Sequence, residues 1–291
     1  MSNTAVKTTV TLTGTGVPHA APGRAGAGVL VRHGDVALQF DAGRATALRL
    51  IEVGISPRDL TATFVTHFHS DHVVDLPDLV LTRWVQENLY RTGPLPIVVP
   101  NGSALRFVER MMDAFDDDIE VRREHTDNVE LRMDITSFDA PPTPTEVWRS
   151  PDGKVTVAAV AVHHEPVKDA VAYRVDTPDG SVVISGDTRV CDEVFAMAAD
   201  CDVLVHEACR ARAMADSIKG TPFEQVFDYH SDSVLLGEFA QRYGIEHLLL
   251  THLIPSPRSA EEAKKFESDV RAGGYTGKVT VGEDLTTVVL G

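Results

Sequence analysis

The chain has 291 residues, which is enough for one large domain or two small ones. Hydrophobic residues make up 43% of it, an ordinary share that can supply a sizeable core. The net charge is −16, so the average field repels nucleic acid and anionic membranes unless a local basic patch overrides it. No apolar run reaches the ~20 residues that a membrane-spanning helix needs, so no membrane span is expected.

The three cysteines, Cys191, Cys201 and Cys209, are odd in number and lack a CxxC spacing. They are most simply reduced, buried side chains of a cytoplasmic protein. Residues 1–7 also lack the charged and then apolar layout of a signal peptide. A soluble, cytoplasmic protein is therefore expected.

In the first half of the chain, alternating or apolar runs predict β-strands and helical spacing predicts helices. The strands are expected at 8–12, 28–31, 36–40, 62–66 and 96–99, and the helices at 45–53, 76–90 and 104–114. The apolar face of 76–90, which includes Leu89, is interpreted as core or subunit contact. The acidic run 116–118 is interpreted as a solvated helix end. Residues 119–150 could hold edge strands or a lid.

The second half repeats the pattern without a linker or a break in composition, so a single domain over 1–291 is expected. Strands are predicted at 155–162, 170–175, 181–184, 203–205, 248–250, 278–281 and 285–290. Helices are predicted at 235–242, with Ser231 or Ser233 at its start, and at 261–271.

Metal-competent residues are concentrated directly after the strand 62–66. His67 and His69 lie two positions apart, so in an extended segment their imidazoles project to the same side. Ser70 could cap a helix that carries Asp71 and His72. Imidazole and carboxylate together suit zinc, and a cluster with open coordination positions is typical of a catalytic site.

Other predicted strands also end in metal-competent residues, namely His164, Asp187, Glu207 and His252. In layered α/β proteins ligands gather at the carboxyl ends of strands, so one shared site is expected. Asp41, between a strand and a helix, is interpreted as a partner of a ligand or as a helix cap, and not as a ligand itself.

The motif HxHxDH over 67–72 resembles the hallmark of the metallo-β-lactamase superfamily. Within the superfamily the chain is most similar to ribonuclease Z and its relatives. The similarity rests on Gly14-Thr15-Gly16, Asp41-Ala42-Gly43, Ser185-Gly186-Asp187-Thr188, His206-Glu207-Ala208 and His230-Ser231. The fold that this resemblance implies is α/β, a four-layer αββα sandwich.

The resemblance also implies a ligand set and two zinc ions per chain. The first zinc ion would be held by His67, His69 and His164, and the second by Asp71, His72 and His252. Asp187 would bridge both, and a shared hydroxide would be the nucleophile. His164 is preferred over His163 because it matches the position of the family's histidine.

The implied catalytic residues are Asp71, Glu207 and His230. In the resembling enzymes the matching Glu–His pair is hydrogen-bonded, and the histidine donates a proton to the leaving group. The alternative is structural: His230 would be a helix N-terminal residue and Glu207 a core carboxylate. His206 is interpreted as structural.

One departure from the family bears on the substrate. Ribonuclease Z usually carries a long basic, Gly-rich arm that grips tRNA, but only 22 residues separate His164 from Asp187 here. Without such an arm, the protein lacks the contacts to tRNA phosphates that dominate nucleic-acid affinity. The expected substrate is therefore a small-molecule ester, either a phosphodiester or a sulfate ester.

The expected assembly is a homodimer.

Three alternatives stay open. The first is tRNA 3′-end processing through another docking surface. The second is lactone hydrolysis, because the same hydroxide could attack a carbonyl. The third is an iron-dependent sulfur dioxygenase, since single-iron enzymes keep the motif. Flavin-partnered diiron enzymes usually replace the second histidine by a carboxylate, whereas His69 is present here.

Overall fold

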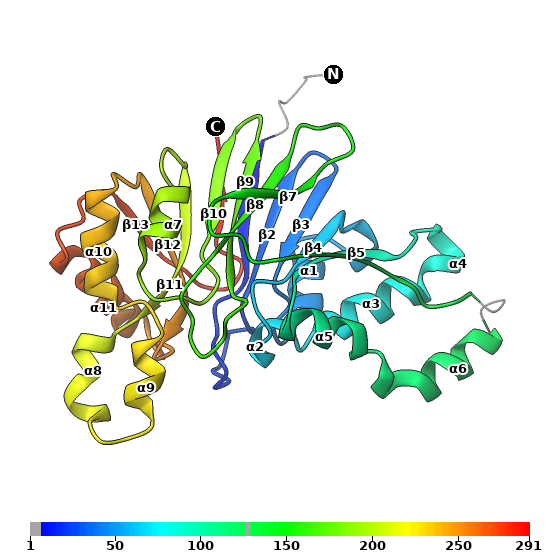
Figure 1. The fold of residues 1–291 in the computed structure, drawn as a ribbon, viewed down its shortest axis with the longest axis horizontal. Coiled ribbons are helices and arrows are strands. Elements are labelled where there is room, and N and C mark those ends of the chain that lie inside the picture. Colours follow the sequence, from blue (N-terminus) through cyan, green and yellow to red (C-terminus); the bar gives the residue numbers. More distant parts are fainter. Residues whose placement is uncertain (1–6, 126–128) are drawn as a thin grey trace.

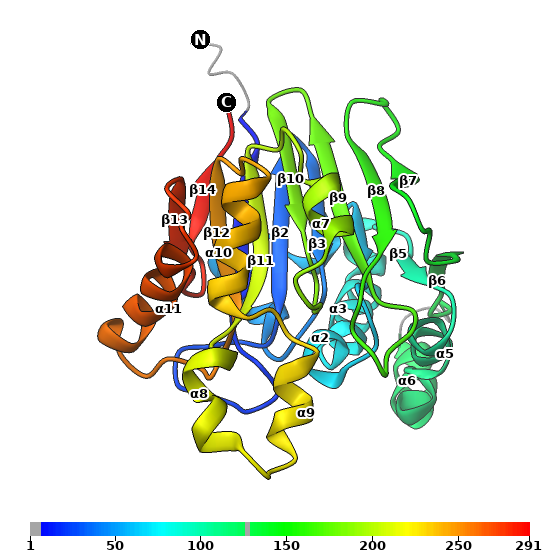
Figure 2. The ribbon, with the colours of Figure 1, turned by 60° about the vertical axis from the view of Figure 1, so that its left-hand side comes forward.

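The structure is a computed structural model that describes residues 7–125 and 129–291. Most of the segment used in the signal-peptide argument, residues 1–6, lies outside the described part. Two seven-stranded sheets face each other, and helices cover both outer faces (Figures 1 and 2). This confirms the predicted αββα sandwich.

The first sheet is mixed and has the order β14-β1-β2-β3-β4-β5-β6. Its strands are β1 (Thr9–Gly14), β2 (Gly28–His33), β3 (Val36–Phe40), β4 (Ala62–Phe64), β5 (Leu95–Pro100), β6 (Met133–Phe138) and β14 (Thr287–Val289). β4 is shorter than predicted because the N–H of Thr66 donates to the Asp41 carboxylate (2.8 Å) and no longer pairs in the ladder.

The second sheet is also mixed, with the order β13-β12-β11-β10-β9-β8-β7. Its strands are β7 (Thr145–Arg149), β8 (Thr156–Ala161), β9 (Val171–Thr177), β10 (Gly180–Ile184), β11 (Val203–Cys209), β12 (His247–Ile254) and β13 (Lys278–Val281). Of the two alternatives for 119–150, edge strands or a lid, the structure has edge strands: β6 lies at the edge of the first sheet and β7 at the edge of the second.

Three apolar clusters fill the spaces between the four layers. The middle one lies between the sheets, where the Phe40 and Phe64 rings stack with centroids 4.7 Å apart and Tyr173 packs against both. Outside the first sheet lie α1 (Thr46–Glu52), α3 (Leu76–Val85) and α5 (Ser103–Arg110). Outside the second lie α7 (Asp192–Met197), α10 (Ser233–Arg242) and α11 (Ala260–Ala272).

The helix predicted over 76–90 is broken at Gln86 into α3 and α4 (Glu87–Tyr90). The Glu87 carboxylate accepts hydrogen bonds from Thr92 and Gly93, which turns the chain toward β5. Leu89 is 77% exposed, so it does not lie in the core, and for this residue the subunit-contact alternative stays a prediction. The other apolar residues of the predicted face are buried; they are Leu76, Leu79, Val80 and Trp84.

The acidic run 116–118 begins a helix, α6 (Asp116–His125), instead of ending one. Acidic residues in the first turn and Arg122, Arg123 and His125 in the last complement the helix dipole at both ends. The predicted helix over 104–114 ends at Arg110 and is followed by a 3₁₀ turn, η2 (Asp113–Phe115). A second 3₁₀ turn, η1 (Pro57–Asp59), precedes β4.

Two short helices, α8 (Ala211–Ile218) and α9 (Phe223–Asp228), project together beyond one end of the second sheet (Figures 1 and 2). The sequence analysis did not predict them. α2 (Ser70–Val73) lies at the same end of the molecule. Among the described helices, none combines the length and apolar character needed to cross a membrane.

Candidate metal centre

The seven predicted metal ligands meet at one end of the two sheets. One set joins His67, His69, His164 and Asp187, whose candidate ligand atoms all lie within 4.8 Å of one another. A second set joins Asp71, His72 and His252 under the same limit. All of them are buried except His69, which is half-buried. Residues more than 180 positions apart in the sequence thus form one compact cluster.

The loop that carries the HxHxDH motif is held by backbone packing. A Cβ atom added to Gly43 would lie 2.2 Å from the carbonyl oxygen of Asp71, and one added to Gly26 would lie 2.8 Å from it. Any larger residue at these positions would displace the loop. α2 begins at Ser70, but His69 occupies the N-cap position, so the prediction that Ser70 caps the helix was wrong.

A β-bulge places His252. β12 was predicted to end near Thr251, but it continues to Ile254 beyond a shift in register. Glu207 pairs with Thr251 and Ala208 with Leu253, which leaves His252 as the extra residue, with a φ of 43°. A bulge of this kind re-aims one side chain, here toward the cluster.

Asp187 lies between the two sets. Its Oδ2 atom is 3.8 Å from Nε2 of His67 and 3.9 Å from Nε2 of His164, both in the first set. The same atom is 3.3 Å from Nε2 of His72 and 3.4 Å from Nε2 of His252, both in the second. One carboxylate oxygen therefore faces imidazoles of both sets.

Three of the imidazoles are oriented by oxygen atoms behind them. Nδ1 of His72 donates to Asp41 Oδ2 at 2.7 Å, and Nδ1 of His164 donates to the backbone oxygen of Tyr229 at 3.2 Å. The Thr66 hydroxyl donates to Asp41 Oδ2, so it accepts from Nδ1 of His67 at 3.0 Å. Each ring therefore turns Nε2 toward the centre, which is the arrangement of metal-bound histidines.

The donor set fits a metal. Nε2 of His67 and of His72 are buried and have no hydrogen-bond partner among the described residues. Nε2 of His164 offers a lone pair because Nδ1 of the same ring donates to Tyr229, and it lies 3.2 Å from Nδ1 of His69, whose role in this contact depends on the tautomer of His69. Burial lowers the pKa of His69 to about 4 and that of His67 well below its usual value, so both are neutral at pH 7. Neutral imidazoles and carboxylates are ligands that zinc prefers.

His163 lies outside the cluster. Its exposed ring is within 3.4 Å of Glu165 and 3.3 Å of Glu193, whereas His164 is buried. The structure therefore brings in His164, the histidine that the sequence analysis preferred.

Glu207 and His230 form a buried pair beside the cluster. Nδ1 of His230 lies 2.9 Å from Oε1 of Glu207, which also accepts the N–H of Thr188 at 2.8 Å. Burial disfavours protonation of His230, but the charge of Glu207 and this hydrogen bond outweigh it and raise the pKa to about 9. The pair can therefore hold a proton at neutral pH. Neighbouring His206 is buried against Phe195, and Nδ1 of its ring bonds to the backbone oxygen of Glu207, while its buried Nε2 has no partner among the described residues.

Thr66 and Tyr229 are site residues that the sequence analysis missed. Thr66 relays a hydrogen bond from His67 to Asp41, and Tyr229 lends its backbone oxygen to His164. Thr66 could have been suspected because it directly precedes the motif. The sequence could not have indicated the role of Tyr229, because a residue of any type supplies a backbone oxygen.

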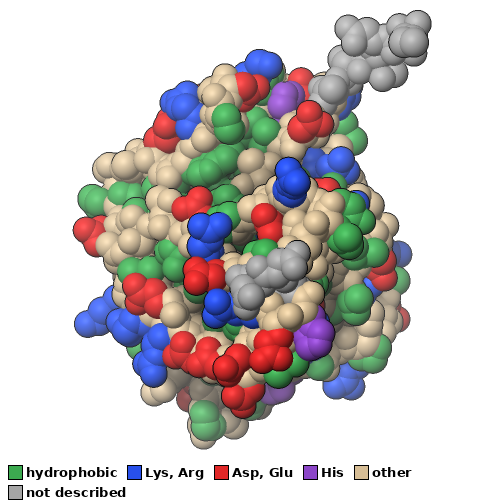
Figure 3. All heavy atoms as spheres, turned by 90° about the vertical axis from the view of Figure 1, so that its right-hand side faces the viewer, with side chains coloured by type: hydrophobic (Ala, Val, Ile, Leu, Met, Phe, Trp, Pro, Cys, Tyr) green, Lys and Arg blue, Asp and Glu red, His purple; other side chains and the backbone are tan. Residues whose placement is uncertain are grey.

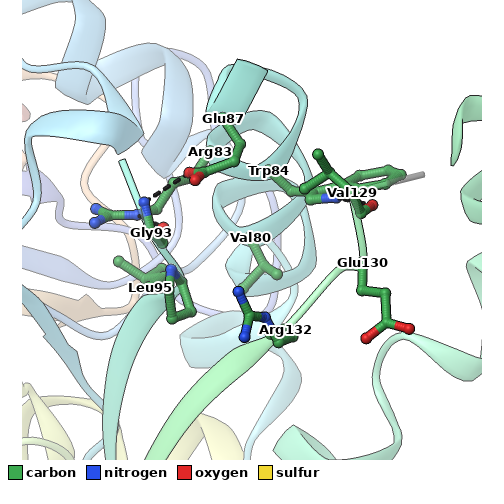
Figure 4. Close-up of a pocket in the computed structure, with 10 residues that line it drawn as sticks. Val80, Arg83, Trp84, Glu87, Gly93, Leu95, Val129, Glu130 and Arg132 are labelled. Atoms are coloured by element: carbon green, nitrogen blue, oxygen red, sulfur yellow. Dashed lines mark hydrogen bonds between the residues drawn. The ribbon is translucent and has the colours of Figure 1, made fainter. Parts of the chain in front are cut away.

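A separate hollow lies between α3 and the segment before β6 (Figure 4). The Arg83 guanidinium at its base donates to backbone oxygens of Thr92, Gly93 and Leu60, among others, so it is committed to structure. Trp84 likewise donates to the backbone oxygen of Val129. The hollow holds none of the clustered metal-competent residues and is not the candidate site.

Comparison with known proteins agrees with this geometry. Residues 38–253 match the model of the beta-lactamase superfamily domain. A protein named ribonuclease Z from Mycobacterium sp. (strain KMS) is 38% identical over 288 residues, which cover 96% of this chain and 95% of that protein. Several other mycobacterial proteins of the same name match over similar spans.

Two solved structures show the same fold. The metallo-beta-lactamase fold protein YhfI from Bacillus subtilis has a TM-score of 0.72 at 20% identity, covering 97% of this chain and 99% of its own. The short form of human tRNase Z has a TM-score of 0.69 at 23% identity with the same coverage. This chain is a hydrolase of the metallo-β-lactamase superfamily and belongs to its ribonuclease Z-like branch.

Proposed function

We propose that the protein is a dizinc phosphodiesterase that cleaves RNA in the manner its relatives' name indicates, at the 3′ end of precursor tRNA. The observation that best supports a dinuclear site is the position of Asp187. Its Oδ2 atom lies within 3.9 Å of Nε2 atoms of histidines from both sets. The first zinc ion would be held by His67, His69 and His164, and the second by Asp71, His72 and His252. Zinc at such a site supplies Lewis acidity and a nucleophile at neutral pH.

The chain's own residues would handle the proton and the alignment. His230, protonated beside Glu207, donates a proton to the departing oxygen of the substrate, as a ribose or alkoxide leaving group requires. Asp41 and Thr66 keep His67 and His72 turned toward the centre. Asp71 Oδ2 and His252 Nε2 lie 3.2 Å apart, so both atoms would face the second zinc ion.

The choice of RNA rests on the relatives. This chain has no long arm, yet it matches 95–97% of the length of the relatives named ribonuclease Z. The missing arm therefore does not distinguish this chain from those relatives. Between His164 and Asp187 the structure has only the β9–β10 hairpin, with its turn at 178–179. RNA would therefore dock on another surface, for which α8 and α9 beside the site are candidates.

The discriminating experiment is cleavage of a precursor tRNA by zinc-loaded protein, at several salt concentrations. Precise cleavage at the 3′ end that His67→Ala abolishes supports the proposal. Tight RNA binding without cleavage, or no interaction at low salt, contradicts it.

A compact phosphodiester or sulfate ester is the second candidate. It is favoured by the short hairpin and by the net charge of −16, which opposes long polyanions. Figure 3 shows a band of acidic side chains, with basic side chains around it, on the face that carries α4 and α6, and such a band disfavours RNA binding there. Hydrolysis of small diesters or sulfate esters with no cleavage of precursor tRNA would select this reading.

The homodimer remains a proposal as well. Leu48 and Ile51 on α1 are 67% and 57% exposed, and Val74 between α2 and α3 is 52% exposed. Apolar side chains of this size on neighbouring helices favour an interface with a second copy. Light scattering that gives the mass of one 31.6 kDa chain would overturn it.

A further inference from the structure

The rim of the metal centre carries aromatic side chains that the packing of the fold does not explain. Among the described residues, the exposed aromatic ones are Phe68, Tyr90 and Phe223, at 37%, 54% and 48%. Tyr90 is covered by the Arg58 guanidinium, 4.0 Å from its ring centre. Phe223 lies on α9, with its ring centre 6.4 Å from that of His19. Phe68 lies inside the HxHxDH motif itself.

Phe68 lies against the first metal set on one side. Its ring centre is 5.4 Å from that of His69, the only half-buried member of that set. The half-buried ring of Tyr229 lies on the other side of the first set. Its centre is 5.1 Å from the ring centre of His164 and 5.1 Å from that of His230. Since the ring centres of His69 and His164 are themselves 5.0 Å apart, a row of neighbouring rings runs from Phe68 through these two imidazoles to Tyr229.

The segment that carries Tyr229 is fixed in place. The Arg189 guanidinium, two residues after Asp187, donates to the backbone oxygen of Asp228 at 2.7 Å. The backbone oxygen of Tyr229 accepts from His164 at 3.2 Å. The backbone that carries the ring is therefore held in place, so a ligand that stacks on the ring has to order only the Tyr229 side chain.

We infer that Phe68 and Tyr229 form a cradle for a planar ring next to the scissile phosphodiester, and so determine specificity. The inference rests on the proposed phosphodiesterase function. The ring would come from a nucleobase of an RNA chain or from the aryl group of a small ester, because stacking on aromatic side chains tolerates any π-face. Each of the two rings lies next to a ligand of the proposed centre, so a ring stacked on either one lies beside the reacting bond.

The test uses three diesters that share the p-nitrophenyl leaving group and differ in the other substituent: thymidine 5′-phosphate, phenyl phosphate and methyl phosphate. Zinc-loaded protein should show kcat/KM on the order of ten-fold higher for the ringed diesters than for the methyl diester, mainly through KM. Preference for the nucleoside over the phenyl diester identifies a nucleobase as the source, and equal preference identifies a general ring site.

Phe68→Leu and Tyr229→Leu should each reduce this ratio several-fold, whereas Tyr229→Phe should retain it because the ring remains. Tyr90→Leu, an exposed aromatic position on α4, should retain the wild-type ratio. Metal content is measured on every variant to exclude loss of the centre. All three diesters carry the nitrophenyl ring, so only the second substituent differs; equal kcat/KM with and without a ring in that substituent, or a ratio unchanged in both leucine variants, overturns the cradle.

A binding measurement separates the cradle from the proposed function. Calorimetry on zinc-loaded protein compares uridine 5′-monophosphate with ribose 5-phosphate, which carries the same phosphate without a ring. If no diester is hydrolysed, the phosphodiesterase fails, but tighter binding of the nucleotide that Phe68→Leu removes would still support the cradle. Equal affinity for the two ligands would contradict it.

Discussion

The carboxylate of Asp41 accepts hydrogen bonds from Nδ1 of His72 at 2.7 Å and from the Thr66 hydroxyl at 2.8 Å, both on Oδ2. Because Thr66 in turn accepts from Nδ1 of His67, one buried oxygen orients a proposed ligand in each metal set. Asp41 has a φ of 56°, a conformation that Asn tolerates better than most residues. The two sets are thus linked through a residue that belongs to neither of them.

Asp41→Asn should therefore weaken zinc at both positions, by on the order of 10–100-fold, because an amide cannot accept from both partners as well as a carboxylate does. Competition with a chromophoric chelator measures the two affinities. Asp75→Asn is the matched control, since Asp75 also accepts a backbone N–H beside the metal loop, from Ala47, but touches no ligand. Unchanged zinc affinity in Asp41→Asn would contradict the coupling.

His230 should matter only when the leaving group needs a proton. A nitrophenolate can leave unprotonated, while a ribose oxygen or an alkoxide needs the proton that His230 holds beside Glu207. His230→Ala should cost little on nitrophenyl diesters and on the order of 10² or more on alkyl diesters. Steady-state kinetics on the two substrate types measure this difference, and His67→Ala should abolish both activities. Equal losses on both types, with metal content intact, would leave His230 a purely structural role.

The buried His247, which lies away from the metal centre, should make the stability of the fold sensitive to acid. It is buried, with Nε2 2.9 Å from the Thr280 hydroxyl, and burial together with the charge of Lys278 lowers its pKa to about 4. Above about pH 6.5 the ring is neutral in both states and contributes nothing. Between about pH 6.5 and pH 4, His247 is protonated in the unfolded chain but stays neutral in the folded chain. The free energy of unfolding therefore falls as the pH falls through this range.

His247→Gln should therefore make the loss of stability shallower, by up to about 1 kcal/mol per pH unit between pH 6.5 and 4. Urea unfolding in the presence of a chelator, repeated across this range, measures the slope without interference from metal. His125→Gln, at an exposed position on α6, should keep the wild-type slope. An identical slope for His247→Gln and wild type would show that other groups dominate acid unfolding.

The sequence could predict those parts of the site that are local in the chain. His67, His69, Asp71 and His72 lie within six positions, and the end of a strand followed by a short helix aims them together. The two-sheet sandwich was also predictable, since most strands carry clear apolar patterns and β9 and β10 join through a recognisable turn.

The remaining features depend on tertiary contacts. The bulge that aims His252 exists only because β11 and β12 pair out of register at that point. The break at Gln86, which exposes Leu89, follows from hydrogen bonds between Glu87 and residues after the helix. α8 and α9 contain one buried residue, Phe227, so these helices are not placed by packing into the core.

The most direct test of the dinuclear centre is zinc content with and without Asp187. Elemental analysis of purified protein should find close to two zinc ions per chain, and Asp187→Ala should lose metal from both positions because its Oδ2 faces imidazoles of both sets. A single iron ion per chain in the wild-type protein, or undiminished metal in Asp187→Ala, would contradict the account.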